Sequence, residues 1–184
     1  MIDGRQYGYL TPENNRRFVR SYNKQQVAGY SVGILYIEEI NYPLMPGNVV
    51  NAYTYDFPVR MKAVQGLTNT KLFNADKSIE DDIMAAAKQL VENEAVRAIC
   101  SACGFFGNYH RKVAGSLNVP VALSSLVQLP WIRSIIGPEK KIGILTANAS
   151  AMTSELFYSC CAEDVKNIVI KDAMQCEEFS TVVN

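Results

Sequence analysis

The stretch AVRAICSACGFF, residues 95–106, decides the fold. Its first half is a short apolar run typical of a buried strand, and a helix is predicted from Phe105 to Leu117. Cys103 therefore lies on a turn from a strand into a helix, where open α/β sheets bind ligands. The positive end of a helix dipole would favour its reactive thiolate form. The structural alternative is that Cys103 is a small apolar core residue.

Strands and helices alternate along the rest of the chain. One helix is predicted to begin at Ser78, as its N-cap, and to bury a stripe formed by Ile79, Ile83, Ala86 (or Ala87) and Leu90. The other predicted helical segments are 105–117, 125–136 and 153–161, and the predicted strands are 30–37, 58–64, 96–101, 119–124, 141–146 and 167–170. Such alternation is typical of the α/β class with a parallel sheet.

An internal echo predicts two similar units. YSVGIL at residues 30–35 and KKIGIL at residues 140–145 both open a predicted strand with Gly-Ile-Leu. We expect an N-terminal extension over 1–29, with a short helix near 14–20, a first α/β domain over 30–138, and the start of a second over 139–184. The second unit is too small for a complete core, so we expect either that the protein continues past Asn184 or that this unit packs against another part of the structure.

Composition excludes several classes of function. The chain has 184 residues, 48% of them hydrophobic, and equal numbers of acidic and basic residues. Without a basic run, neither a nucleic acid nor a membrane surface is expected as a partner. No apolar stretch is long enough to span a bilayer, and the first residues do not resemble a signal peptide. Five cysteines, an odd number, indicate reduced thiols, and we expect a cytoplasmic protein.

Three familiar uses of cysteine and histidine are disfavoured. Cys100 and Cys103 form a CxxC pair, but Cys100 falls in the predicted strand, which argues against a redox dithiol. No further paired ligands support a zinc site. His110 lies seven residues after Cys103, too far along a helix for a catalytic pair, and is interpreted as a surface or partly buried histidine.

Polar residues follow two more predicted strands. Ser124 and Ser125 end one strand, and Thr146 with Asn148 ends another. Their hydroxyl, amide and backbone N–H groups suit a carboxylate or a phosphate, although each residue is also an ordinary helix cap. Together with Cys103, they predict a ligand site at one edge of the sheet.

Four segments resemble the aspartate/glutamate racemase superfamily. They appear in order across most of residues 30–160: GILYIE (33–38) with the loop residues PGN (46–48) and NAYTYDFPV (51–59), ACGFF (102–106), VPVALSSLVQLP (119–130) and IGILTANA (142–149). The resemblance implies two similar parallel-sheet α/β domains related by a pseudo-twofold axis, with the active site between them and the second domain incomplete in this chain.

The resemblance also implies a chemistry. Members of the family racemise amino acids with two cysteines on opposite faces of the substrate α-carbon and need no pyridoxal phosphate, metal or other cofactor. Cys103 matches the first catalytic cysteine, and the second is expected beyond Asn184. The substrate-binding residues implied are Asn51, Thr54, Gly104, Ser124, Ser125, Thr146 and Asn148.

We therefore expect a cofactor-independent racemase or related isomerase of an amino acid or other small carboxylate, as a homodimer in keeping with many family members. Two alternatives stay open. The first is a single-thiol decarboxylase or diacid isomerase of the same superfamily. The second is a non-catalytic protein that binds a small carboxylate.

Overall fold

The computed structural model describes residue 27, residues 29–40 and residues 42–183. The helix expected near residues 14–20 and nearly all of the expected N-terminal extension lie outside this part.

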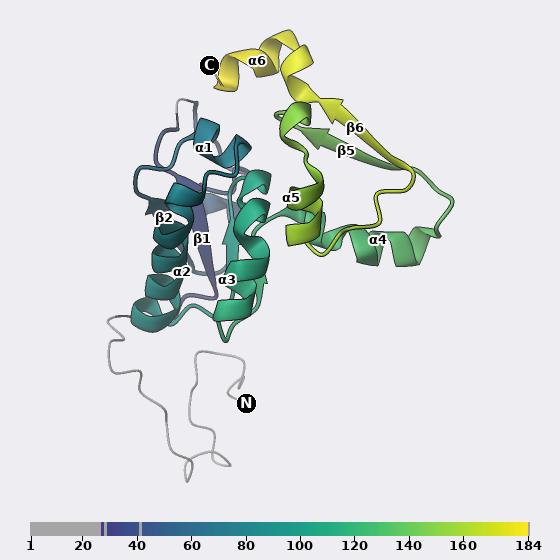
Figure 1. Ribbon diagram of the computed structural model, residues 1–184. Coiled ribbons are helices and arrows are strands. Elements are labelled where there is room, and N and C mark those ends of the chain that lie inside the picture. Colours follow the sequence, from purple (N-terminus) through teal and green to yellow (C-terminus); the bar gives the residue numbers. More distant parts are fainter. Residues whose placement is uncertain (1–26, 28, 41, 184) are drawn as a thin grey trace.

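Two parallel sheets form the framework of the fold (Figure 1). The first has four strands in the order β2-β1-β3-β4, and the second pairs β5 with β6. This confirms the predicted α/β class with parallel sheets. The strands are β1 (Val32–Ile37), β2 (Val59–Val64), β3 (Ile99–Ser101), β4 (Val121–Ala122), β5 (Ile142–Thr146) and β6 (Ile168–Asp172).

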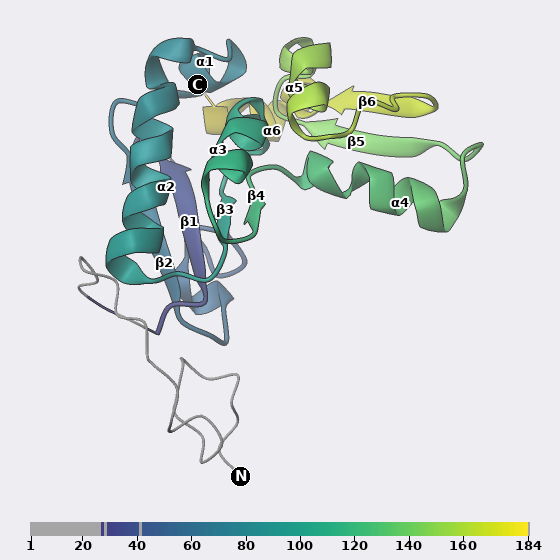
Figure 2. The same ribbon diagram turned by 60° about the horizontal axis from the view of Figure 1, so that its bottom comes forward.

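Helices connect the strands and cover the first sheet. In Figures 1 and 2, α2 runs alongside β1 and β2, while α3 lies near β3 and β4. The α-helices are α1 (Asn69–Phe73), α2 (Glu80–Glu94), α3 (His110–Ser116), α4 (Leu129–Ile136), α5 (Ser154–Ser159) and α6 (Glu177–Val183). The 3-10 turns are η1 (Ala52–Thr54), η2 (Lys77–Ile79), η3 (Gly104–Tyr109), η4 (Ser125–Gln128), η5 (Ala149–Ala151) and η6 (Ala173–Gln175).

The start of α2 differs from the prediction. Ser78 is not its N-cap, because a 3-10 turn precedes the helix and Asp76 caps that turn by accepting the Ser78 N–H at 2.9 Å. Asp and Ser are both good caps, so the residue two positions earlier takes the role. The predicted apolar stripe is confirmed, since Ile79, Ile83, Ala86, Ala87 and Leu90 are all buried.

The helix predicted from Phe105 to Leu117 is two elements. Its first part is the 3-10 turn η3, and only the second part is the α-helix α3. Gly107 in η3 packs directly against α5, where an added Cβ would lie 2.8 Å from Leu156 Cδ1. The close packing of a turn from the first part of the chain on a later helix is a tertiary constraint that local sequence patterns do not contain.

A single hydrophobic cluster connects the two sheets. It combines residues of the first sheet, such as Leu35 and Ile99, with Leu156 and Phe157 of α5 and Ile142 of β5. Gly33 and Gly143, the glycines of the two matching Gly-Ile-Leu segments, lie within β1 and β5 respectively. The division of the chain into domains at residues 138 and 139 stays a prediction.

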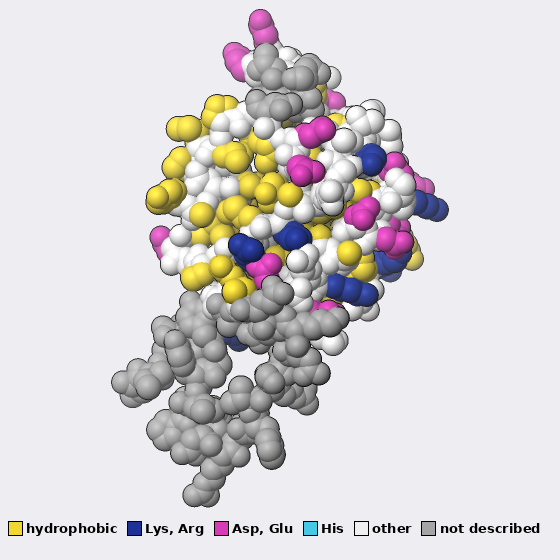
Figure 3. Space-filling view, turned by 90° about the vertical axis from the view of Figure 1, so that its left-hand side faces the viewer, with side chains coloured by type: hydrophobic (Ala, Val, Ile, Leu, Met, Phe, Trp, Pro, Cys, Tyr) yellow, Lys and Arg dark blue, Asp and Glu magenta, His cyan; other side chains and the backbone are white. Residues whose placement is uncertain are grey.

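One side of the molecule carries many exposed apolar groups. Figure 3 looks onto the side on which β2 lies and shows hydrophobic side chains gathered over a broad area between scattered charges. The loop between β1 and β2 supplies several of the most exposed ones in the protein, including Met45 and Tyr53. Among the described helices, none combines the length and apolar character needed to cross a bilayer.

Candidate functional site

A cavity of about 490 Å³ lies at the carboxyl ends of β1, β3 and β4 and reaches β5. This is the edge at which parallel α/β sheets bind ligands. Its lining includes aromatic, hydroxyl and amide side chains around one thiol: Tyr36, Glu39, Tyr42, Asn48, Asn69, Phe73, Cys103, Gly104, Phe105, Ser124, Ser125, Leu126, Thr146, Met152 and Phe179, with Ile37, Ile40, Val50, Ala102, Ile144, Leu145 and Ala147. The structure thus brings five of the eight predicted site residues together: Cys103, Gly104, Ser124, Ser125 and Thr146.

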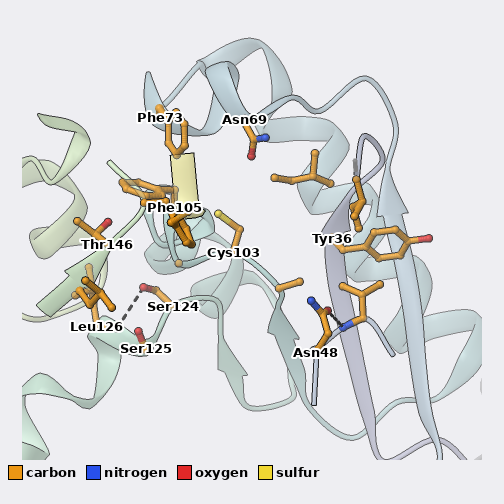
Figure 4. A pocket seen from close by; sticks show the side chains of 18 of the residues that line it. Tyr36, Asn48, Asn69, Phe73, Cys103, Phe105, Ser124, Ser125, Leu126 and Thr146 are labelled. Atoms are coloured by element: carbon orange, nitrogen blue, oxygen red, sulfur yellow. Dashed lines mark hydrogen bonds between the residues drawn. The ribbon is translucent and has the colours of Figure 1, made fainter. Parts of the chain in front are cut away.

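Cys103 occupies the centre of this cavity (Figure 4). It follows β3 and is the N-cap of η3, with extended backbone angles. The hydroxyl of Ser101 fixes the turn, because it lies 3.1 Å from the Cys103 carbonyl oxygen and 2.6 Å from the Leu123 carbonyl oxygen. Ser101 therefore ties the turn that carries the thiol to the end of β4, a role that the sequence did not reveal.

The electrostatic setting of Cys103 differs from the prediction. Burial raises the pKa of the Cys103 thiol, and a hydrogen bond from the Phe105 N–H lowers it only in part. The expected helix dipole is weak here, because the turn that follows Cys103 is a short 3-10 turn rather than an α-helix. The neutral thiol is thus favoured over the thiolate, and the thiolate, once formed, is a stronger base than an ordinary one.

Three hydroxyl groups lie on one side of the thiol. In Figure 4, Ser124, Ser125 and Thr146 lie on one side of Cys103, and Asn48 and Tyr36 lie on the other. The Ser124 Oγ accepts the Leu126 N–H at 3.2 Å and so caps η4. Ser124 and Thr146 are buried, whereas Ser125 is exposed. Hydroxyl groups that converge on one region of a cavity can donate to a carboxylate.

The remaining three predicted residues do not line the cavity. Asn51 caps η1 and donates from Nδ2 to the Leu44 carbonyl oxygen at 2.6 Å. Thr54 donates to the Asn48 carbonyl oxygen at 2.7 Å and accepts the Gly47 N–H. Asn148 caps η5 by accepting the Ala151 N–H. All three serve local turns, so the structure gives them a role in loop conformation rather than a place at the cavity.

Sequence reasoning missed Glu39, Tyr42, Asn69 and Phe179, which all line the cavity. Glu39 is the single charged residue of the described lining, which contains no Lys or Arg. It follows β1, the neighbour of β3 in the sheet. Sheet order could have pointed to this position, but it depends on pairing between distant segments.

The other candidate groups do not line the cavity. Cys160 is buried, and its thiol donates to the Gly107 carbonyl oxygen at 3.6 Å, while Cys161 and Cys176 are exposed. His110 is buried and its Nδ1 accepts the Leu123 N–H at 3.4 Å, so it is not a partner of Cys103. Over the described part of the chain, no three His, Cys, Asp or Glu residues gather as a metal site.

Comparison with known proteins finds similarity to lyases. No family model matches the chain. It is 32% identical over 124 residues to the dimethylsulfoniopropionate lyase of Durusdinium sp. clade D, covering 66% of this chain and 41% of that protein. It is 27% identical over 160 residues to dimethylsulfoniopropionate lyase 7 of Emiliania huxleyi, covering 84% of this chain and 46% of that protein.

Among solved structures, an aspartate racemase homologue from Pyrococcus horikoshii OT3 is similar, with a TM-score of 0.46 and 17% identity over 83% of this chain and 69% of that one. The sequences reported above are named as lyases rather than racemases, so an isomerase activity is not confirmed. The chain spans less than half the length of these curated relatives.

Proposed function

We propose that Cys103 is the acid–base group of a lyase that removes a proton from the carbon next to the carboxylate of a small substrate. The observation that carries the proposal is the position of its thiol, central in a cavity whose strand ends supply hydroxyl donors. The similarity to dimethylsulfoniopropionate lyases supports an elimination on this substrate class.

The reaction follows from the substrate's structure. Dimethylsulfoniopropionate is a propionate with a dimethylsulfonium group on its third carbon, so the leaving sulfide is neutral. The Cys103 thiolate takes a proton from the second carbon, and the C–H electron pair becomes the double bond between the second and third carbons. The carbon–sulfur bond breaks with both electrons going to sulfur. The products are acrylate, dimethyl sulfide and a protonated Cys103, which returns its proton to solvent.

The hydroxyl groups would stabilise the developing charge. As the α-proton leaves, negative charge moves onto the substrate carboxylate, and preorganised donors aimed at it lower the barrier. Ser124, Ser125 and Thr146 are the donors proposed for this role. Because burial raises the pKa of Cys103, kcat/KM should rise with pH until the thiol ionises, above the ordinary value of 9.0.

Racemisation shares the first step but needs a second group. An acid must return the proton to the opposite face, whereas elimination ends with loss of the sulfide. Cys103 is the one cysteine of the cavity lining within the part of the chain described. The similarity to dimethylsulfoniopropionate lyases is what favours elimination over racemisation.

The decisive experiment compares two cysteines of the same segment. Purified protein is incubated with dimethylsulfoniopropionate, and dimethyl sulfide is measured by headspace gas chromatography. Cys103→Ala should lower kcat/KM by about 10²-fold or more. Cys100→Ala is the matched control, because Cys100 does not line the cavity, and it should keep most of the activity.

The other outcomes separate the alternatives. Full activity in Cys103→Ala would overturn the proposed role. Absence of dimethyl sulfide with deuterium exchange at the α-carbon of an amino acid would indicate a racemase instead. Thermal stabilisation by small carboxylates without either reaction would indicate a non-catalytic binding protein.

A further inference from the structure

We infer that Glu39 forms the cation-binding end of the cavity and selects substrates with a positively charged onium group on the third carbon of a small carboxylate. The inference rests on the proposed function for the identity of the substrate class. Its support comes from the charge of the lining and from the order of the strands.

The charge of the cavity favours a cationic end group. Glu39 is the single charged residue of the described lining, and no Lys or Arg accompanies it. No ion pair or hydrogen bond joins its carboxylate to the rest of the described structure. A second carboxylate, as in aspartate or glutamate, would meet repulsion from Glu39 and find no cation in the described lining to pair with.

The order of the strands gives the cavity two ends. In the sheet, β1, β3 and β4 are consecutive neighbours, followed in the chain by Glu39, Cys103 and Ser124 respectively. Neighbouring strands lie about 4.8 Å apart, so the segments with the carboxylate and the hydroxyl lie roughly 10 Å apart with the thiol segment between them. A substrate that is positive at one end and negative at the other would lie along this edge.

That orientation places the reacting carbon at the thiol. With the substrate carboxylate at Ser124 and Ser125 and the onium group toward Glu39, the carbons between them lie next to Cys103. Tyr42 lines the cavity three residues after Glu39 and adds aromatic surface, which attracts onium cations. Recognition of the leaving group thus comes from the segment after β1 and recognition of the carboxylate from the segment after β4.

The test uses two ligands of equal shape that differ in charge. They are 3-(trimethylammonio)propionate and 4,4-dimethylpentanoate, in which a carbon atom replaces the charged nitrogen. Calorimetric titration measures the affinity of each for the purified protein. The wild type should bind the ammonium compound roughly tenfold more tightly, about 1.4 kcal/mol. Glu39→Gln should abolish most of this preference and raise the KM for dimethylsulfoniopropionate more than it lowers kcat.

Glu38→Gln is the matched control, because Glu38 is adjacent in sequence and exposed, as Glu39 is, but is absent from the lining. It should keep the wild-type preference. Equal binding of the two ligands by the wild type, no binding of either, or an unchanged preference in Glu39→Gln would each overturn the subsite. If the protein has no lyase activity but prefers the ammonium compound in a way that depends on Glu39, the proposed function is refuted and the cation subsite is supported.

Discussion

Replacing Gly107 by alanine tests how closely η3 packs against α5. An added Cβ would lie 2.7 Å from Cys160 Sγ, 2.8 Å from Leu156 Cδ1 and 2.9 Å from Ser124 Cβ. Real Cβ atoms do not approach neighbours this closely, so the side chains of Leu156 and Cys160, the segment at Ser124 or η3 itself must shift. Overpacking of this kind costs about 1–3 kcal/mol.

The expected net effect has a definite sign. Removing a glycine from a helical turn gains up to about 1 kcal/mol, which offsets part of the steric cost. We expect Gly107→Ala to lower the free energy of unfolding by about 1–2 kcal/mol and Tm by roughly 2–8 °C. Because Ser124 is one of the displaced neighbours, ligand affinity should fall as well.

Thermal unfolding followed by circular dichroism measures the effect, with Gly115→Ala as the control. Gly115 lies in α3 with open space around its Cα, so alanine there should raise Tm by a few degrees, up to roughly 4 °C. Combining Gly107→Ala with Cys160→Ala removes one of the three contacts. The double variant should therefore lose less free energy of unfolding than the sum of the losses of the two single variants. A Tm of Gly107→Ala at or above that of the wild type would refute the packing described here.

Two further predictions concern groups near the cavity. Ser101→Ala removes the hydroxyl that ties the Cys103 turn to β4 and should lower the free energy of unfolding in urea by about 1 kcal/mol, together with kcat/KM; an unchanged urea midpoint would contradict this role. Burial raises the pKa of Cys160 from its ordinary value of 9.0 to about 11, so the folded state holds this proton more tightly than the unfolded state. Stability should therefore be intact below pH 9.0 and fall as the pH rises toward 11, and urea titrations should show a smaller fall in Cys160→Ala.

The framework was predictable because its signals are local. Continuous apolar runs marked the strands, including those that became β1 and β5, and the stripe from Ile79 to Leu90 marked α2. Two predictions about helices were wrong, one because of a contact with a distant segment and one because two neighbouring residues can both act as caps. The segment after Cys103 forms η3 rather than an α-helix where Gly107 meets α5, and Asp76 competes with Ser78 for the cap.

The candidate site was predictable to the extent that it follows strand ends. Cys103, Ser124 and Thr146 lie at the ends of predicted parallel strands and meet in one cavity. Asn51 and Asn148 could not be separated from ligand-binding residues by sequence, because an amide that caps a turn and an amide that binds a ligand occur in the same local patterns. The place of Glu39 at the cavity could be predicted only from the strand order, because that order arises from pairing between segments far apart in the chain.

The same strand order has a consequence for how specificity can change. The segments after β1, β3 and β4 are neighbours in space but are separated along the chain by whole helices. Exchanging the short segment after β1 would alter the end of the cavity near Glu39 while leaving the turn of Cys103 and its tie to β4 intact. A protein engineer could therefore retarget one end of the bound molecule without rebuilding the reactive centre, and gene variants could diversify in the same stepwise manner.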